Sequence, residues 1–244
     1  MLKFIGIGSA FNHAELDNAA YIKKGRELLL IDCGSDIFKA LLSKGILEGI
    51  DQIYMVVTHL HPDHIGSLGN LIFYNSLVLK IKPLQIFYPD QTSLQQLLTL
   101  QDVNPEFYKL YTTFADMPLS SSEFSQYTIK ALPQQHRGLT NAYGYLFTTE
   151  KETFFYSGDS KTIPKEILEM LFNGWLDVLY QDISSHDHEN IPHLSYKRLL
   201  ELIPEPFRFK VYCMHLDSAF SMEEAIKAGF NVAQNESGEG SLTH

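Results

Sequence analysis

The sequence has few cysteines, few basic residues and no long apolar run. Its two cysteines, Cys33 and Cys213, lie in apolar strand-like segments, and we interpret them as small core residues rather than as a disulfide. No apolar stretch approaches the roughly 18 residues that a membrane span requires. Glycine breaks segment 1–8 too early for a signal peptide. We therefore expect a protein of the cytoplasm, or of the host cytoplasm if the chain is viral, without membrane contact.

Acidic residues outnumber basic ones, with 29 Asp and Glu against 19 Lys and Arg, for a formal net charge of −10. Binding to nucleic acid draws much of its affinity from Lys and Arg, so a long nucleic acid is disfavoured as a partner. The sequence also lacks a Gly/Ser linker, an internal repeat and a low-complexity run. Its 244 residues are 45% hydrophobic, and we expect residues 1–244 to form one domain with a large core.

Short strand-like segments alternate with helical segments along the chain. Strands are expected near 2–7, 18–23, 27–32, 53–58, 84–87, 126–132, 143–148, 153–157, 177–182 and 210–214. Helices are expected near 36–44, 66–75, 91–100, 164–172, 195–203 and 222–228. This alternation predicts the α/β class without deciding how the sheets are arranged.

The most informative segment is 58–64, which follows an apolar stretch and reads THLHPDH. His59 and His61 are two residues apart on an extended backbone, so their side chains point the same way and can share a metal ion. Asp63 and His64 follow a turn at a proline and can face a second ion. Imidazole and carboxylate suit zinc, manganese, iron or nickel better than calcium or magnesium. Paired cations about 3.5–4 Å apart are a common device for hydrolysis, so the segment predicts a dinuclear metallohydrolase.

The alternative interpretation is that these side chains are structural. Four buried polar groups in six positions would then each need a hydrogen-bonding partner. A metal ion supplies partners for all of them at once. We therefore favour the metal site.

The HxHxDH pattern resembles the signature of the metallo-β-lactamase fold superfamily. That family adds a later His, a bridging Asp and a final His at strand ends, and the sequence offers His136, Asp159 and His215 in this order. The resemblance implies an αββα sandwich of two mixed sheets with helices outside. It also implies two zinc ions, or manganese in their place, held by seven ligands: His59, His61 and His136 at one ion, Asp63, His64 and His215 at the other, and Asp159 between them.

The spacing of Asp159, His193 and His215 resembles that of the tRNase Z branch of this superfamily. In that branch a His, held by an acidic residue at an earlier strand end, protonates the leaving oxygen. Here His193 and Asp182 match those roles, and we count them, together with Asp63, as catalytic residues. An alkoxide is a poor leaving group without such an acid, and a carboxylate behind the ring keeps it basic and oriented. The alternative is that His193 is only a loop residue before the next helix.

The interval from His136 to Asp159 has room for only a strand pair and a turn. This interval resembles the one in tRNase Z into which a long arm that grips the tRNA is inserted, but here it is too short for such an arm. The short interval and the acidic charge together favour a small phosphodiester over RNA.

Segments 5–12, 18–22 and 66–74 resemble the viral anti-Pycsar phosphodiesterases and their bacterial relatives. The resemblance implies hydrolysis of 3′,5′-cyclic nucleotides (cCMP and cUMP, and with them cAMP and cGMP) to 5′-monophosphates, which would counteract antiphage signalling. It further implies homodimers in which one subunit helps close the pocket of the other. The alternatives are a tRNase Z-like RNA 3′-processing endonuclease and a lactone or thioester hydrolase of the same fold.

A cyclic nucleotide also needs a flat surface for its base and a cation for its phosphate. Tyr108 and Tyr111, in a polar segment, and Phe73 are our candidates for stacking on the base. Arg137 and Lys161 are candidates for neutralising phosphate. A further histidine-rich segment, 185–189, is interpreted as a solvated loop near the pocket rim.

Overall fold

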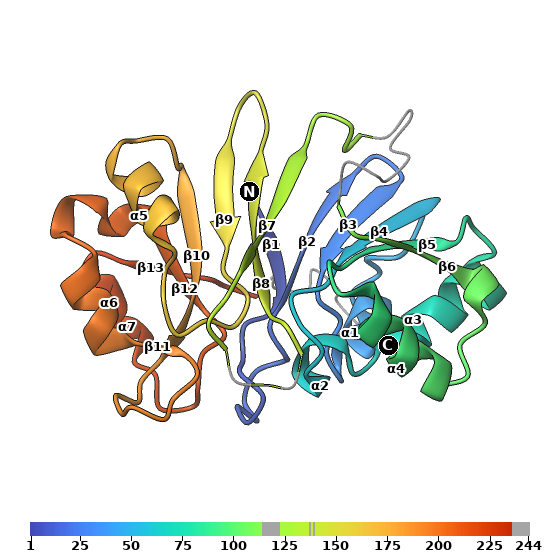
Figure 1. Ribbon diagram of the computed structural model, residues 1–244, viewed down its shortest axis with the longest axis horizontal. Coiled ribbons are helices and arrows are strands. Elements are labelled where there is room, and N and C mark those ends of the chain that lie inside the picture. Colours follow the sequence, from blue (N-terminus) through green and yellow to red (C-terminus); the bar gives the residue numbers. More distant parts are fainter. Residues whose placement is uncertain (114–122, 137, 139, 236–244) are drawn as a thin grey trace, which may run out of the picture.

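Two β-sheets face each other in this protein (Figure 1). The computed structural model describes residues 1–113, 123–136, 138 and 140–235. The first sheet contains, in spatial order, β1 (Lys3–Gly6), β2 (Ala19–Lys24), β3 (Glu27–Ile31), β4 (Gln52–Val56), β5 (Leu84–Phe87) and β6 (Tyr108–Tyr111). Its first three strands are antiparallel neighbours, whereas β3 to β6 run parallel.

The second sheet is also mixed. Its main path contains, in spatial order, β13 (Asn231–Val232), β12 (Val211–Met214), β10 (Val178–Ser184), β9 (Thr153–Tyr156), β8 (Tyr143–Thr148) and β7 (Thr128–Pro133). A further strand, β11 (Leu194–Ser195), pairs with β10 beside this path. Strands β13 to β9 run parallel, and β9, β8 and β7 are antiparallel.

Helices lie outside each sheet (Figure 1). Those beside the first sheet are α1 (Ile37–Ser43), α3 (Leu68–Tyr74) and α4 (Gln91–Leu100). Those beside the second sheet are α5 (Lys165–Phe172), α6 (Tyr196–Leu202) and α7 (Met222–Lys227), together with the 3₁₀ helix η4 (Glu205–Lys210). A one-turn helix, α2 (Pro62–Ile65), lies among the loops at the lower edge in Figure 1. The predicted αββα sandwich is therefore confirmed.

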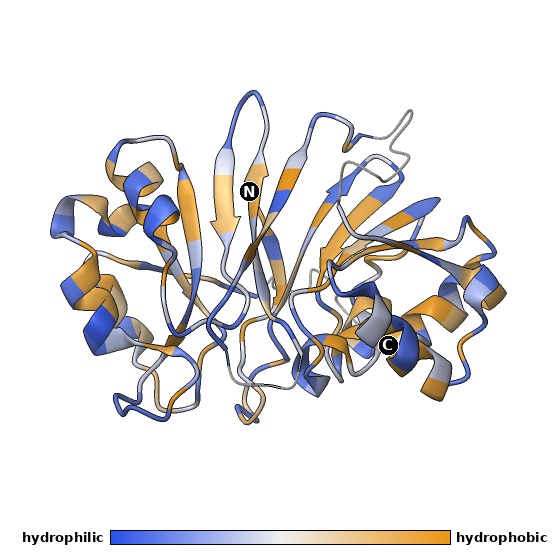
Figure 2. Ribbon diagram, in the orientation of Figure 1, coloured by the Kyte–Doolittle hydropathy of each residue, from blue (hydrophilic) through white to orange (hydrophobic). Residues whose placement is uncertain are grey.

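The alternating side chains of β3 show how the layers form. Leu28 and Leu30 belong to the core between the first sheet and its helices, whereas Leu29 and Ile31 belong to the core between the two sheets. Successive residues of a strand point to opposite faces, so a strand covered on both faces must be apolar at every position. Apolar residues accordingly run along the strands, and hydrophilic residues gather in the loops (Figure 2).

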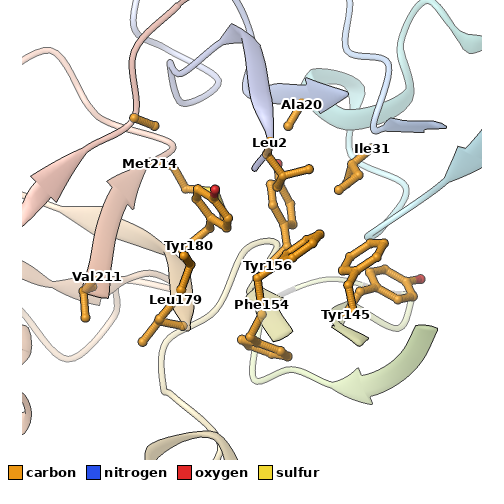
Figure 3. Close-up of a cluster of buried hydrophobic side chains, with 14 of the residues drawn as sticks. Leu2, Ala20, Ile31, Tyr145, Phe154, Tyr156, Leu179, Tyr180, Val211 and Met214 are labelled. Carbon is orange, nitrogen blue, oxygen red and sulfur yellow. The ribbon is translucent and has the colours of Figure 1, made fainter. Parts of the chain in front are cut away.

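Aromatic side chains fill much of the space between the sheets. Ala20 and Ile31 of the first sheet face Tyr145, Phe154 and Tyr156 of the second (Figure 3). Such rings bury a large apolar area each, which makes them major contributors to core stability. Both cysteines are buried and unbridged, as the sequence predicts.

The expected strands and helices are found within a few residues, with three short strands missed. Strands β11 and β13 have two residues each, and β6 contains a lysine. Each depends on pairing with a neighbour distant in sequence, and its own residues carry little signal. Across the described part of the chain, no helix is long and apolar enough to span a membrane.

Candidate metal centre

Five polar side chains lie at or near the carboxyl ends of strands from both sheets. His59 lies after β4, His136 after β7, Asp159 after β9 and His215 after β12, while Asp182 lies within β10, two residues before the strand ends. Parallel neighbouring strands end at the same edge of a sheet. The sandwich therefore brings these residues together at one end of the two sheets, as the sequence predicts.

The first group of ligand atoms comes from three histidines. Nε2 of His59 lies 3.0 Å from Nδ1 of His61, and Nε2 of His136 lies 3.2 Å from the same atom. Oδ2 of Asp159 lies 3.7 Å from His59 Nε2 and 3.8 Å from His136 Nε2. Burial lowers the pKa of His59 well below its ordinary value, so its imidazole is neutral. Such nitrogens and a carboxylate fit a transition-metal ion.

The second group lies beside the first and uses the other oxygen of Asp159. Its Oδ1 lies 3.1 Å from Nε2 of His64 and 3.4 Å from Nε2 of His215. Oδ2 of Asp63 lies 3.3 Å from both of these nitrogens. Burial raises the pKa of Asp63, but the hydrogen bonds with His215 and His64 outweigh it and leave the pKa well below its ordinary value. Asp63 is therefore a carboxylate.

Two buried atoms of the second group test whether a cation fits there. Nε2 of His64 and Oδ1 of Asp159 lie 3.1 Å apart as an ion-pair contact, but among the described residues neither atom has a partner that meets hydrogen-bond geometry. Buried polar groups without partners are costly. Burial lowers the pKa of His64, yet Asp159 and Asp32 outweigh it and raise the pKa well above its ordinary value. The position therefore attracts positive charge, and its donor set fits a metal ion.

The backbone is constrained where it delivers these ligands. Gly158 has a φ of +57°, and a Cβ there would come within 2.8 Å of the carbonyl oxygen of Tyr143 and 2.9 Å of Cβ of Thr58. His215 and Asp32 adopt φ of 56° and 63° although neither is glycine. Such left-handed residues cost free energy and collect at functional sites. The fold therefore holds the backbone at Gly158, His215 and Asp32 in a left-handed conformation, which a regular strand does not adopt.

Asp182 links the metal centre to the predicted acid. Its carboxylate is fully buried, and Oδ2 accepts hydrogen bonds from Nδ1 of His193 at 2.7 Å and from the backbone N–H of Ser160 at 2.9 Å. Oδ1 accepts from Nδ1 of His215 at 3.1 Å. Burial lowers the pKa of His193, but Asp182 outweighs it, so the pKa lies above its ordinary value. A histidine with a raised pKa beside the cluster is suited to act as a general acid.

Asp32 is a candidate positioning residue that the sequence analysis missed. Its buried carboxylate accepts hydrogen bonds from Nδ1 of His64 and from both the backbone N–H and the hydroxyl of Thr58, each at 2.8 Å. A partner of this kind fixes the tautomer of a ligating imidazole, so that Nε2 of His64 is left to bind the metal. The available signal was an acidic residue directly after the apolar strand β3.

The two groups open into a cavity of about 860 Å³. Its wall includes His61, His136, Asp159, His193 and His215. The described residues that complete the lining are mostly small or acidic, and none of them is Lys or Arg: Ser9, Ala10, Phe11, Asn12, His13, Glu15, Asp17, Ser35, Asp36, Pro62, Asp63, Ser184, His186, Ile191, Pro192, Asp217 and Ser218. An anion bound among these described residues would meet no Lys or Arg side chain.

The predicted base-stacking residues do not lie at this cavity. Tyr108 is buried in β6, where pairing with β5 turns it into the core beneath the helices. Tyr111 packs against the core between the sheets, and Phe73 of α3 packs edge-to-face on Phe107 at 6.2 Å. None of the three predicted residues lines the cavity. The prediction that they lie at the mouth of their own chain's pocket is wrong. Tyr108 and Tyr111 belong to a paired strand and not to a polar loop, and Phe73 packs on Phe107.

The predicted cations have separate outcomes. Arg137 lies outside the described residues. Lys161 donates a hydrogen bond to the backbone carbonyl of Glu189 at 2.6 Å and does not line the cavity. In the histidine-rich loop, His186 lines the cavity, which confirms that this loop is near the rim.

Residues 1–236 match the family model described as "Anti-Pycsar protein Apyc1". The chain belongs to the anti-Pycsar Apyc1 family. It is 30% identical over 226 residues to the anti-Pycsar protein Apyc1 of Paenibacillus harenae, with 88% of each chain covered. It is 27% identical over 235 residues to the Apyc1 protein of Bacillus phage 010DV004, again with 88% of each covered.

Solved structures give the same fold. The metallo-β-lactamase fold protein YhfI of Bacillus subtilis superposes with a TM-score of 0.73 at 21% identity and covers 97% of both chains. The fold and the family that the sequence predicts are therefore confirmed. This Apyc1 family member is a metal-dependent hydrolase, and its histidine–carboxylate cluster is the candidate metal centre.

Proposed function

We propose that this Apyc1 family member hydrolyses 3′,5′-cyclic nucleotides to 5′-monophosphates at a dinuclear metal centre. The observation that carries the proposal is the position of His193. Held by Asp182 at 2.7 Å, it lines the same cavity as Asp159 and His215. A bound phosphodiester would thus meet metal ligands and a proton donor at once.

Seven side chains would hold the metal ions in two groups that share Asp159: His59, His61 and His136 in the first, and Asp63, His64 and His215 in the second. Zinc is the ion we propose, with manganese as an acceptable substitute, because the ligands are imidazole and carboxylate. Bound divalent cations would neutralise the phosphate and lower the pKa of an attacking water molecule. Asp63, which stays ionised, is placed to accept a hydrogen bond from that water as well as to bind metal.

His193 determines the direction of cleavage in this proposal. Nδ1 donates to Asp182, so the ring can present its other nitrogen to the leaving oxygen. Protonation of O3′ as its bond to phosphorus breaks gives a 3′-hydroxyl and leaves the phosphate on O5′. The product is therefore a 5′-monophosphate.

The cavity favours a small substrate. Its volume of about 860 Å³ falls within the range of about 300–1,000 Å³ that is typical of small-molecule sites. Between His136 and Asp159 the described chain forms the hairpin of β8 and β9, with no inserted arm. The acidic residues that line the cavity disfavour a polyanion such as RNA. The name of the family and its occurrence in a phage support a role against a cyclic-nucleotide defence signal.

We further propose a homodimer. Leu77, Val78 and Leu100 expose 56%, 59% and 89% of their surface, and a second copy of the chain could cover such apolar side chains. Light scattering coupled to size-exclusion chromatography measures the assembly directly. A strictly monomeric, fully active protein would remove this part of the proposal and leave the chemistry intact.

The deciding experiment compares substrates with purified, metal-loaded protein. The panel contains cCMP, cUMP, cAMP and cGMP, their 2′,3′-cyclic isomers, and a precursor tRNA, with products identified by chromatography. We expect the 3′,5′-cyclic nucleotides to give 5′-monophosphates. Cleavage of the precursor tRNA with no hydrolysis of any cyclic mononucleotide would disprove the proposal. Formation of 3′-monophosphates would retain the substrate class and contradict the placement of O3′ beside His193.

A further inference from the structure

An exposed aromatic ring stands at the mouth of the cavity. Phe11 has 86% of its surface exposed, yet it lines the same cavity as Asp159 and His193. Burying a phenyl ring is favourable by about 1.5–3 kcal/mol. A ligand that covers this exposed ring would therefore gain binding free energy. Among the described lining residues, Phe11 is the single Phe, Tyr or Trp.

The turn that carries this ring is held firmly. The side-chain amide of Asn12 donates a hydrogen bond to the carbonyl of Leu216 at 2.9 Å, and its oxygen accepts one from the backbone N–H of Ala14 at 3.2 Å. Asn12 is itself buried. Leu216 directly follows the metal-centre residue His215, so the turn is braced against the centre. The exposure of Phe11 is therefore a property of an ordered turn, whose position relative to the metal ligands is defined.

A second apolar surface lies elsewhere on the cavity wall. Ile191 and Pro192 line the cavity and directly precede His193. Ala10, next to Phe11, adds to the apolar lining at the turn. The cavity thus combines histidines and carboxylates with a few apolar side chains, among them the large and exposed Phe11. This combination matches a ligand with a charged end and a flat, weakly polar end.

We propose that Phe11 is the stacking platform for the base of the substrate. The inference rests on the proposed function, because a cyclic nucleotide held by its phosphate at the metal centre would extend its base toward the mouth. Stacking on an aromatic ring tolerates different bases, since each base has a π-face. Phe11 would therefore improve binding of pyrimidine and purine substrates alike. It replaces Tyr108 and Tyr111 in the role that the sequence analysis gave to them.

The test compares a substrate with a base and one without. The substrates are cCMP and a ribose 3′,5′-cyclic phosphate that carries hydrogen in place of the base, and the variants are Phe11→Ala, Phe11→Tyr and Phe209→Ala. Phe209 is a matched control because it exposes 63% of its surface but lies in η4, away from the cavity. The measured quantity is the ratio of kcat/KM for cCMP to that for the base-free substrate.

We expect Phe11→Ala to lower this ratio roughly tenfold to hundredfold, mainly through KM, because stacking on an aromatic ring contributes about 1–3 kcal/mol per base. Phe11→Tyr should restore it, and Phe209→Ala should match the wild type. An unchanged ratio in Phe11→Ala would overturn the proposal. If Phe11→Ala converts a dimer to a monomer while the ratio stays at the wild-type value, the proposal is also overturned. The ring would then serve a contact between subunits.

A binding measurement separates this inference from the proposed function. Trp175 is the only tryptophan of the sequence, so Phe11→Trp combined with Trp175→Phe leaves one fluorescent reporter at the mouth. Stacking of a hydrolysis-resistant 3′,5′-cyclic phosphorothioate of cytidine should quench its emission. Quenching together with no turnover of cyclic nucleotides would retain the platform and reject the proposed reaction. Turnover without quenching, and with an unchanged ratio in Phe11→Ala, would retain the reaction and reject the platform.

Discussion

Oδ2 of Asp182 accepts a hydrogen bond from Nδ1 of His193 at 2.7 Å. The other oxygen of the same buried carboxylate accepts from Nδ1 of the metal-centre residue His215 at 3.1 Å. One side chain therefore orients both the proposed acid and a proposed metal ligand. Because both rings donate from Nδ1, each leaves Nε2 for the chemistry, and a change at Asp182 must affect metal binding and proton transfer together.

Asp182→Asn tests this coupling. An asparagine keeps one acceptor oxygen, but its amide cannot accept hydrogen bonds from two imidazoles and the N–H of Ser160. We expect metal affinity to weaken about 10–100-fold, the range typical of lost partners behind metal ligands. At saturating metal, kcat should still fall by about 10²–10⁴ because the acid is misplaced. A competing chelator measures the affinity, and circular dichroism checks the fold. Loss of activity with metal affinity equal to wild type would disprove the link to His215.

His193→Ala should lower kcat for cyclic nucleotides by about 10²–10⁴, the range typical of one general acid, with metal content unchanged. The control is an ester with an activated leaving group, p-nitrophenolate, which departs without protonation and should lose much less. Steady-state rates on both substrates decide the matter. If both substrates lose activity equally, His193 positions the substrate instead of donating a proton.

Removing the metal should destabilise the protein. Without cations, the carboxylates of Asp63 and Asp159 lie buried close together, and atoms such as Nε2 of His64 lack partners. A ligand at 100 times its dissociation constant stabilises the folded state by about 2.7 kcal/mol. We therefore expect chelation to lower Tm by roughly 5–10 °C, with recovery at two equivalents of zinc. Calorimetry and elemental analysis measure these effects, and saturation at one metal per chain would refute the dinuclear centre.

Much of the metal centre could be predicted because its residues obey local rules. His59, His61, Asp63 and His64 are so close in sequence that the backbone alone brings them together. His136, Asp159 and His215 each follow an apolar run, and ends of parallel strands meet at one edge of a sheet. The pairing of Asp182 with His193 was predicted from the resemblance to the tRNase Z branch. Spacing and hydrophobic pattern therefore located these residues, and the resemblance to the metallo-β-lactamase fold superfamily supplied their expected roles as ligands.

The mouth of the cavity depends on contacts between residues far apart in sequence. Phe11 lies at the mouth because Asn12 binds the carbonyl of Leu216, 204 residues away. Tyr108 is in the core because β6 pairs with β5, although its local sequence is polar. In both cases the direction of a side chain follows from a distant partner, which periodicity does not encode. The sequence by itself therefore determined the α/β class and the metal-binding segment 58–64, and its family resemblance implied the sandwich and the proposed chemistry. The tertiary structure decided which aromatic ring lies at the cavity, because that depends on contacts between residues far apart in sequence.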